Sequence, residues 1–431
     1  MVLVYVQKRS PRITYIFKQL MGRILGLNLE FTSKIEEFIA FKGIKFSYGE
    51  KRMGNELFVK SHGLLDEQGI VKMDIPVSFW GEVPAFFFVG EESDLPYDIF
   101  SAAFYLLSRY EEYLPHKKDE YGRFPYAESL SFKNNFLKIP VVDLWAYKFK
   151  DLLKQEFPGN DFPTRKFKAK NIMAVAELFR YKEKGVVRNV GGGLRDFFQL
   201  RFKAIFNRLK TQLALANDPF DVYNEVLRFS KQNKISWEFM FQLSDYSSRC
   251  NNIGHNNLKY HSMIKSMGDY GAVGLLLGYE ALHDKQTLLK EKKRWEEIVN
   301  RDLERALSVL YGINLPDLYN NYDTLEIAHD YSMGYPSRIG FRAGTCTSFL
   351  YYDLNLERIS PLLIHPAAIN STAFEYSSFF EIKTVLDRVR KQVKAVDGEL
   401  LMIYKNSDFV EGQRRDKFFQ IIERMNNDEG H

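Results

Sequence analysis

Short apolar runs alternate with amphipathic segments over the second half of the chain, and this alternation restricts the fold more than any other feature. Strands are predicted over residues 168–175, 236–243, 272–277, 324–327 and 400–404, and helices over residues 194–215, 218–233, 256–267, 284–301 and 381–396. Strands that alternate with helices are typical of parallel sheets with helical crossovers. The pattern therefore predicts an α/β fold, as a (β/α) barrel or a doubly wound sheet. In a barrel, reactive side chains lie at the carboxyl ends of the strands.

The first 160 residues have a different pattern, which predicts a smaller α+β domain. Strands are expected over residues 2–6 and 56–60, and helices over residues 98–113 and 143–154. Asp98 is suited to cap the first of these helices, because its carboxylate can accept from the amides of the first turn. The segment 157–164 is rich in turn-forming residues. We therefore place a boundary there, between an N-terminal domain over residues 1–160 and a barrel domain over residues 165–431.

Composition narrows the range of partners and compartments. The net charge is +5, from 60 Lys and Arg against 55 Asp and Glu, which is too small and too mixed to indicate nucleic-acid binding. Cys250 and Cys346 lie far apart without zinc-type spacing, so they suggest a reducing compartment rather than a disulfide framework. No apolar run reaches the roughly 18 residues that indicate a membrane span. The apolar residues 2–6 read as a first strand rather than as a signal peptide, and we expect a cytoplasmic protein.

Two features of the segment 191–215 allow more than one interpretation. Apolar residues recur at helical spacing through 200–210, with basic residues on the outer face. Such a helix could contact a membrane surface, although a plain solvated face is the favoured interpretation. Gly191-Gly-Gly193 lacks the Lys-Ser/Thr ending of a phosphate loop. We therefore interpret it as a flexible hinge.

Several longer sequence motifs indicate a family. They are Leu95-Pro-Tyr-Asp-Ile-Phe-Ser-Ala-Ala-Phe-Tyr-Leu-Leu-Ser-Arg-Tyr-Glu-Glu-Tyr113, Asp119-Glu-Tyr-Gly-Arg-Phe124, Ser244-Asp-Tyr246, Gly254-His-Asn-Asn257, Asp330-Tyr-Ser-Met-Gly-Tyr335, Gly340-Phe-Arg-Ala-Gly-Thr345 and Ile364-His-Pro366. The chain resembles the polysaccharide deacetylase-like proteins of Bacteroidetes-type bacteria. These proteins pair an N-terminal domain of unknown function with a chitooligosaccharide-deacetylase homology domain. The resemblance covers nearly the whole chain and implies a distorted (β/α) barrel after a smaller α+β domain.

The resemblance also implies a chemistry against which this sequence can be compared. Active members of the family bind one divalent metal through an Asp and two His, while a second Asp acts as base and a further His protonates the leaving amine. A Lewis-acid metal polarises the acetamide carbonyl and lowers the pKa of the attacking water, and a carboxylate takes the proton. Deacetylation by this route therefore needs all of these side chains.

This chain departs from the family at each of those positions. A motif like Asp-Val-Asp-Val-Ala is Ala174-Val-Ala-Glu-Leu178 here, so alanine replaces both acids. A motif like Val-Gly-Leu-His-Pro-Ser-Tyr carries Leu276 in place of its His, and one like Arg-Gln-His ends in Val309. The last motif, like Ile-Phe-His-Asn, is Ile403-Tyr-Lys-Asn406, with Lys405 in place of the His. We expect no catalytic residue, no metal and no cofactor.

Other polar residues could still form a binding site. Arg342 lies in a motif whose Arg orients a catalytic Asp in active relatives, and it could bind an anion or pair with Asp330. His329, His365 and Asn406 are further candidates for the pocket, with structural roles as the alternative. Alternation along the strand points Glu177 away from Ala174 and Ala176, so we expect it not to replace the lost acids. Lys405 and Arg342 without carboxylates would favour anionic groups such as uronate, sialate or phosphate.

Three functional hypotheses follow. The first is a catalytically inactive deacetylase-type protein linked to surface polysaccharide metabolism, which binds a glycan or a partner enzyme of polysaccharide biosynthesis. The second is an active carbohydrate deacetylase or hydrolase of non-peptide C–N bonds with relocated ligands. The third is a purely structural interaction module.

Overall fold

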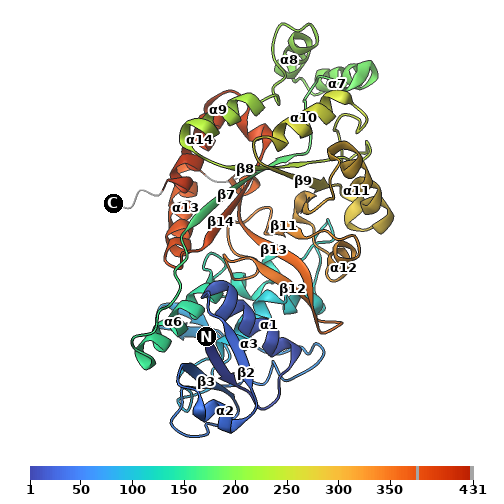
Figure 1. Ribbon diagram of the computed structural model, residues 1–431. Helices are drawn as coiled ribbons and strands as arrows, with labels where there is room; N and C mark the ends of the chain where they lie inside the picture. Colours follow the sequence, from blue (N-terminus) through green and yellow to red (C-terminus); the bar gives the residue numbers. More distant parts are fainter. Residues whose placement is uncertain (375–377, 428–431) are drawn as a thin grey trace.

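Seven parallel strands close into a barrel in the computed structural model, which describes residues 1–374 and 378–427 (Figure 1). The barrel order is β11-β10-β9-β8-β7-β14-β13, and β13 pairs with β11 to close it. These strands are β7 (Lys168–Val175), β8 (Trp237–Phe241), β9 (Ala272–Leu277), β10 (Arg305–Ser308), β11 (His329–Met333), β13 (Arg358–Asn370) and β14 (Glu399–Lys405). The short strand β12 (Phe349–Asp353) runs antiparallel on the outer part of β13. The expected distorted (β/α) barrel is confirmed.

Helices connect most of the barrel strands and cover the outside of the barrel (Figure 1). They are α7 (Gly185–Phe198), α8 (Phe202–Gln212), α9 (Tyr223–Asn233), α10 (Leu258–Gly268), α11 (Lys285–Val299), α12 (Asp317–Thr324), α13 (Phe379–Lys394) and α14 (Gln413–Asn426). α11 shows how the sequence specifies them. Asp284 caps it by accepting from the Thr287 amide, and Leu288, Trp295 and Ile298 are buried on its inner face.

The interior of the barrel is packed with apolar side chains. Ile172, Met240, Leu276, Leu307, Tyr311, Tyr331, Ala367, Leu401 and Ile403 form one buried cluster inside the strands, with Ala174 and Val309 packed against it. The barrel is therefore a solid core in which access is limited to its ends.

The N-terminal region contains its own parallel sheet in the order β2-β1-β3-β4. Its strands are β1 (Val2–Tyr5), β2 (Leu29–Thr32), β3 (Ile44–Gly49) and β4 (Phe58–Lys60), with a hairpin of β5 (Ser78–Trp80) and β6 (Val83–Ala85). Its helices are α1 (Pro11–Phe17), which continues into a π-helix (Lys18–Ile24), α2 (Ile35–Ala40), α3 (Ile99–Leu107), α4 (Tyr110–Tyr113), α5 (Leu130–Lys133) and α6 (Val141–Glu156). Phe17 stacks on Phe100 with ring centroids 3.9 Å apart at the centre of this region.

Ion pairs and hydrogen bonds attach the N-terminal region to the barrel. Buried Asp143 of α6 accepts from the Cys346 amide and from the Thr345 hydroxyl, at 2.9 and 2.6 Å. It also pairs with Arg165, at 3.0 Å, in the segment that leads into β7. Because a buried carboxylate is stable only with such partners, the two regions pack through a fixed polar contact.

The sequence predicted some elements correctly and others wrongly. The strand over 168–175 and the helix over 284–301 are confirmed within two residues at each end, and Asp98 caps α3 through the amides of Phe100 and Ser101. The strand expected over 324–327 is wrong, because α12 runs to Thr324 and the next strand begins at His329. The helix expected over 194–215 begins at Gly185 instead and breaks near Leu200, whose φ is +55°. Gly191–Gly193 are thus inside α7 and not in a hinge loop.

Candidate functional site

A cavity of about 470 Å³ lies at the carboxyl ends of the barrel strands. Its walls come from the ends of β7, β9, β10, β13 and β14, from the loops that follow β8, β9 and β11, and from a loop of the N-terminal region. The lining residues are Tyr121, Ala174, Ala176, Gln242, Arg249, Leu276, Tyr279, Leu307, Ser308, Val309, Leu310, Tyr311, Pro336, Asn370, Thr372, Ile403, Tyr404 and Lys405. This is the end of a barrel at which ligands bind in proteins of this architecture.

The five positions at which the sequence is expected to depart from the family motifs meet in this cavity. All five line it: Ala174, Leu276 and Lys405 lie on β7, β9 and β14, whereas Ala176 and Val309 directly follow β7 and β10. Among residues 1–374 and 378–427, no group of three or more His, Cys, Asp or Glu is placed to hold a metal ion. Methyl and isopropyl groups cannot coordinate a metal or take a proton. The side chains present therefore do not fit the metal that the family resemblance implies.

The floor of the cavity is the apolar interior of the barrel. Leu276, Leu307 and Ile403 are at most 3% exposed and belong to the buried cluster inside the strands. Burial raises the pKa of Tyr311 well above its ordinary value, so its phenol stays neutral. The floor offers apolar contact and a neutral hydroxyl rather than charge.

The described lining contains two cations and no carboxylate. Lys405 lies at the end of β14 and Arg249 in the loop after β8. The Arg249 guanidinium lies over the Tyr279 ring, 3.8 Å from the centroid, which is close for a cation–π contact. No carboxylate in the described part of the chain forms an ion pair with Arg249, whose side chain is exposed. A guanidinium without an acidic partner among the described residues favours an anionic ligand group.

Neutral polar groups on the β13 and β10 sides complete the wall. Asn370 and Thr372 both donate to the Pro336 carbonyl, and the Thr372 amide donates to the Asn370 carboxamide oxygen at 3.1 Å. Ser308 is only 1% exposed, and its Oγ has no hydrogen-bond partner among the described atoms. A buried hydroxyl without a partner is costly unless something else bonds to it. Ser308 is therefore a candidate contact for a ligand hydroxyl.

The N-terminal region contributes Tyr121 to the cavity through a tight loop. Asp119 accepts from the amides of Tyr121 and Arg123, at 3.0 and 2.9 Å, and from Arg123 Nε at 2.8 Å. Arg123 Nη1 in turn donates to the Leu310 carbonyl at 2.6 Å, on the barrel side. The loop is thus held over the mouth of the barrel. The sequence of this loop is one of the motifs on which the resemblance to the polysaccharide deacetylase-like family rests.

Arg342 and Asn406 do not line the cavity. Arg342 is 1% exposed and donates two hydrogen bonds to Glu112 of α4, at 2.9 and 2.7 Å. Asn406 is also buried and donates to the Glu177 carbonyl at 2.8 Å, which ties the end of β14 to the segment after β7. Arg342 is consequently not available to a ligand, and the cation that accompanies Lys405 at the cavity is Arg249.

Asp330 is buried in β11 and does not pair with Arg342. It accepts from the Tyr319 hydroxyl at 2.8 Å and from the Ser332 amide and hydroxyl at 2.9 and 2.7 Å. Burial raises its pKa to about 6, and these hydrogen bonds only partly offset that effect. Asp330 fastens α12 to β11, which is a structural role.

His329 and His365 lie together at the opposite end of the barrel from the cavity. His329 begins β11, and its Nδ1 is 3.1 Å from His365 Nε2. His365 also contacts the Ser348 hydroxyl at 2.9 Å and stacks on Tyr331, with centroids 4.4 Å apart. Burial lowers the pKa of both imidazoles, which favours the neutral forms. The two residues are a pair, but not part of the cavity.

Glu177 points away from the cavity, as alternation along the strand predicts. Its carboxylate pairs with Lys184 at 2.6 Å and with Arg180 at 3.8 Å. It is not among the lining residues.

In the comparison with known proteins, a family model matches the first part of the chain. Residues 2–158 match the model of a "Family of unknown function (DUF7033)". No curated protein matches the chain. No described helix is long and apolar enough to cross a membrane.

Three solved structures share parts of the architecture at low identity. One, from Mycobacterium smegmatis and assigned as a polysaccharide deacetylase, is 8% identical, with 62% of this chain and 86% of that chain covered and a TM-score of 0.40. The Puue allantoinase is 9% identical, with 72% and 91% covered and a TM-score of 0.38. A mutant of a CE4 family pseudoenzyme with restored enzymatic activity is 8% identical, with 61% and 63% covered and a TM-score of 0.31. Such low scores carry no argument about function, and the barrel is established by the strand pairing itself.

Proposed function

We propose that this chain is a catalytically inactive protein of the polysaccharide deacetylase type, linked to surface polysaccharide metabolism, which binds a glycan with an acidic group in the barrel-end cavity. The proposal is supported by an open cavity that is lined by the five positions expected to have lost the acids and histidines of the family. Five motif positions that need acids, histidines or a general acid are Ala174, Ala176, Leu276, Val309 and Lys405, and all five line one open cavity of about 470 Å³.

The lining suits a sugar better than a purely apolar ligand. Tyr121 provides a ring on which the apolar face of a pyranose can stack, and Tyr279 and Tyr311 add aromatic area to the wall and floor. Ser308 provides a hydroxyl without a partner among the described atoms, and Asn370 and Thr372 add polar groups to the wall. Sites that combine apolar walls with a few polar groups are typical of small-ligand binding.

The charge of the lining residues favours an acidic sugar over a neutral one. Arg249 and Lys405 face the cavity, and no described lining residue is acidic. A uronate or sialate carboxylate would gain a charge-assisted hydrogen bond from the Arg249 guanidinium, whereas a neutral sugar would not. Such a bond contributes about 1.5–3 kcal/mol, which corresponds to roughly 10- to 100-fold in affinity.

The test is calorimetric binding of an oligogalacturonate and of a neutral galacto-oligosaccharide of the same length to the full chain. We expect the acidic ligand to bind at least about 10-fold more tightly. Arg249→Gln should abolish this preference. The matched control is Arg301→Gln, which removes an exposed arginine just before β10, at the other end of the barrel. Equal affinities for the two ligands, or an unchanged preference in Arg249→Gln, would refute the proposal.

A second arm of the test addresses catalysis. The chain is incubated with N-acetylated chitooligosaccharide and divalent metal, and released acetate is measured. Release that depends on stoichiometric bound metal and stops on chelation would favour an active deacetylase with relocated ligands. No binding of either glycan and no acetate release would favour a structural module.

A further inference from the structure

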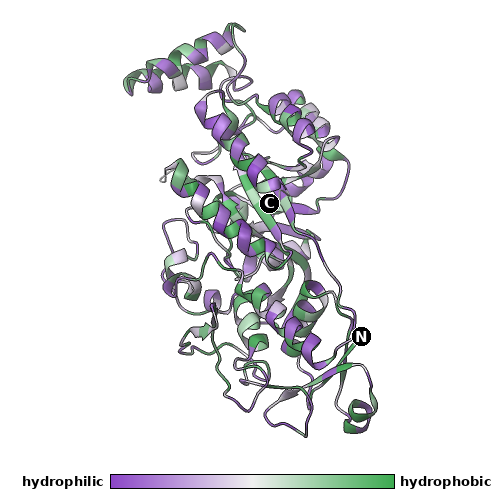
Figure 2. Cartoon of the chain, turned by 90° about the vertical axis from the view of Figure 1, so that its left-hand side faces the viewer, coloured by the Kyte–Doolittle hydropathy of each residue, from purple (hydrophilic) through white to green (hydrophobic). Residues whose placement is uncertain are grey.

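A pair of helices projects from the barrel as a separate outgrowth, which we call the arm. It comprises residues 185–215, with α7 (Gly185–Phe198) and α8 (Phe202–Gln212) side by side. In Figures 1 and 2 it stands at the top of the molecule, at the end far from the N-terminal region. It leaves the barrel after β7, hence from the strand ends that form the cavity.

The outer surface of the arm is apolar to a degree that is unusual for helices in water. Twelve large apolar side chains on it are each between 54% and 86% exposed. They are Val186, Val187, Val190, Leu194, Phe197, Phe198, Leu200, Phe202, Phe206, Leu209, Leu213 and Leu215. Exposed apolar side chains gathered on one element mark an interaction surface, whereas single ones do not.

The seam between the two helices is polar. Arg208 of α8 donates to the Asp196 carboxylate at 2.7 Å and to the Asn189 amide oxygen at 3.1 Å, both on α7. Thr211 is 3% exposed at the same seam. A Cβ at Gly192 would lie 2.7 Å from the Arg208 guanidinium, so glycine there allows the close approach. The arm therefore has polar side chains between its helices and apolar side chains on its surface. This is the reverse of the pattern expected for a helical hairpin exposed to water.

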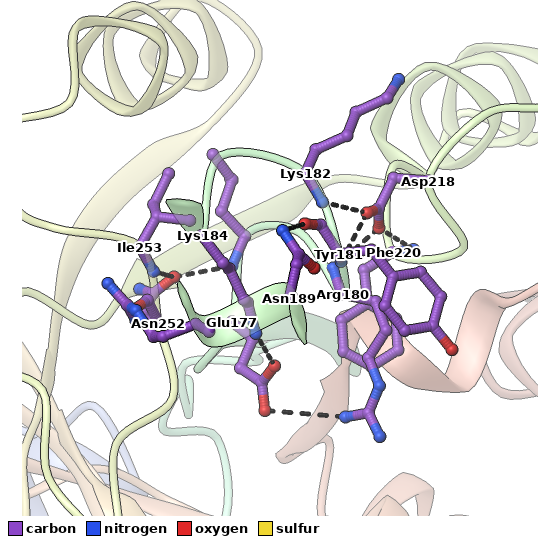
Figure 3. A network of polar contacts seen from close by, with 12 residues as sticks. Glu177, Arg180, Tyr181, Lys182, Lys184, Asn189, Asp218, Phe220, Asn252 and Ile253 are labelled. Atoms are coloured by element: carbon purple, nitrogen blue, oxygen red, sulfur yellow. Dashed lines mark hydrogen bonds and ion pairs between the residues drawn. The ribbon is translucent and has the colours of Figure 1, made fainter. Parts of the chain in front are cut away.

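The root of the arm is fixed to the barrel by a dense set of hydrogen bonds (Figure 3). The Asp218 carboxylate accepts from the amides of Arg180, Tyr181, Lys182 and Phe220, at 2.7 to 2.9 Å. These amides belong to the segments that enter and leave the arm. One side chain therefore holds both ends of the outgrowth together and fixes where it projects.

The exposed charged side chains of the arm are basic. The segment 185–215 contains six basic residues and one acidic residue, and the whole chain has a net charge of +5. The single acid, Asp196, is buried and neutralised by Arg208. Arg195, Arg201, Lys203 and Lys210 are exposed beside the apolar side chains. The arm therefore presents cations and apolar groups together, without an exposed acid.

We propose that the arm docks on an anionic lipid bilayer, with its Phe and Leu side chains at the boundary of headgroups and acyl chains and its basic side chains on the phosphates. Helices with exposed aromatic and aliphatic residues beside Lys and Arg bind membrane surfaces in this way. α7 and α8 have 14 and 11 residues, so at 1.5 Å per residue neither reaches the roughly 30 Å of a bilayer core. The arm lies in the interface and does not span it.

The charge of the arm favours an anionic bilayer over a second copy of the chain as its binding partner. Two arms packed face to face would bring the same four exposed cations toward each other with no acid between them, which is unfavourable. An anionic bilayer supplies both the negative charge and the apolar phase. The proposal also orients the molecule, because the N-terminal region lies at the far end from the arm (Figure 1). It does not depend on the proposed glycan binding.

The test is flotation of the full chain with vesicles of phosphatidylcholine alone and with about 30% phosphatidylglycerol. We expect binding to the anionic vesicles that weakens at high salt, and little binding to the neutral ones. Phe198→Ser/Phe202→Ser and Arg195→Gln/Arg201→Gln/Lys203→Gln should each reduce binding at least about 10-fold. The matched control is Phe380→Ser, which changes a 77% exposed phenylalanine on α13, outside the arm, and should bind like the unmodified chain.

Folding of the variants is checked by the thermal unfolding midpoint, which should stay unchanged because the altered side chains are exposed. A tryptophan at position 198 (Phe198→Trp) should shift its emission to the blue on anionic vesicles, whereas Phe380→Trp should not. Absence of vesicle binding, or equal loss in the Phe380→Ser control, would overturn the proposal. So would a dimer in sedimentation that Phe198→Ser/Phe202→Ser dissolves. None of these outcomes affects the glycan test, because the vesicles contain no sugar ligand.

Discussion

Arg342 in the loop after β11 and Glu112 in α4 form a two-point ion pair, with Nε–Oε1 at 2.9 Å and Nη2–Oε2 at 2.7 Å. Both side chains are at most 3% exposed. Arg109 also pairs with Glu112, at 2.8 Å, so one carboxylate serves two guanidinium groups. The arginine expected at the binding site therefore fastens the barrel to the N-terminal region.

Removal of this carboxylate should destabilise the protein strongly. Glu112→Gln leaves two buried guanidinium groups facing a neutral amide, and breaking a buried pair costs about 3–5 kcal/mol. We expect a clear fall in the midpoint of urea unfolding. The matched control is Glu92→Gln, which breaks an ion pair with Lys60 whose carboxylate is 81% exposed and should leave the midpoint unchanged. Equal effects of the two substitutions would contradict a structural role for the buried pair.

The same carboxylate should produce a defined acid dependence. Burial opposes its ionisation, but Arg342 and Arg109 outweigh burial and lower the pKa of Glu112 from 4.5 to about 2. A carboxyl with a lowered pKa in the folded state stabilises the fold above its unfolded pKa, and this contribution is lost as the pH falls through the folded pKa. The difference in unfolding midpoint between the unmodified chain and Glu112→Gln should thus be constant above about pH 5 and shrink toward pH 2. A difference that grows on acidification would be inconsistent with this linkage.

Metal ligands introduced at three of the lining positions that are expected to differ from the family motifs should create a metal site. Ala176→Asp/Leu276→His/Val309→His places one carboxylate and two imidazoles on the walls of one cavity. We expect the triple variant to bind on the order of one Co²⁺ per chain, with a visible absorption band and a raised unfolding midpoint. Leu276→His alone is the control, because a lone buried imidazole should cost about 1–3 kcal/mol without a gain from metal. One chelatable ion per unmodified chain would show instead that ligands exist elsewhere.

Loss of the Asp218 carboxylate should release the arm. Asp218→Ala leaves four backbone amides at the root without their acceptor. We expect limited proteolysis to cut within residues 178–222 at least about 10-fold faster, because local opening becomes easier. Asp284→Ala, which removes the cap of α11, is the control and should not change cleavage in the arm. Unchanged cleavage in Asp218→Ala would mean that other contacts hold the root.

The barrel could be predicted from the sequence because strand and helix periodicities alternate clearly around β7, β8, β9 and β14. β10 is only four residues long, and β13 contains Pro361 and Pro366, which disfavour a strand by local pattern. β13 is a strand because tertiary pairing on both sides supplies what local propensity does not.

The residues that line the cavity could be predicted where a sequence motif places them at the end of a strand. The hydrogen-bond partner of a side chain could not be predicted, because it depends on the tertiary structure. The five positions expected to differ from the family motifs meet in the cavity because strand ends converge in a barrel. The sequence does not identify Glu112 as the partner of Arg342, because Glu112 lies 230 residues earlier in the chain. Arg249 was missed because it lies in a loop without periodicity. The loop's position at a strand end was the one signal that could have indicated it.

The composition of the cavity wall determines how binding would respond to acidity. The described lining residues include no histidine, aspartate or glutamate, the side chains that ordinarily titrate between about pH 3 and pH 7. A hydrolase that relies on an acid and a base shows a bell-shaped pH profile set by the enzyme's own groups. Here, occupancy by an acidic sugar would follow the protonation of the sugar's own carboxyl group. As far as the described lining is concerned, the pH sensitivity of the complex would then come from the ligand.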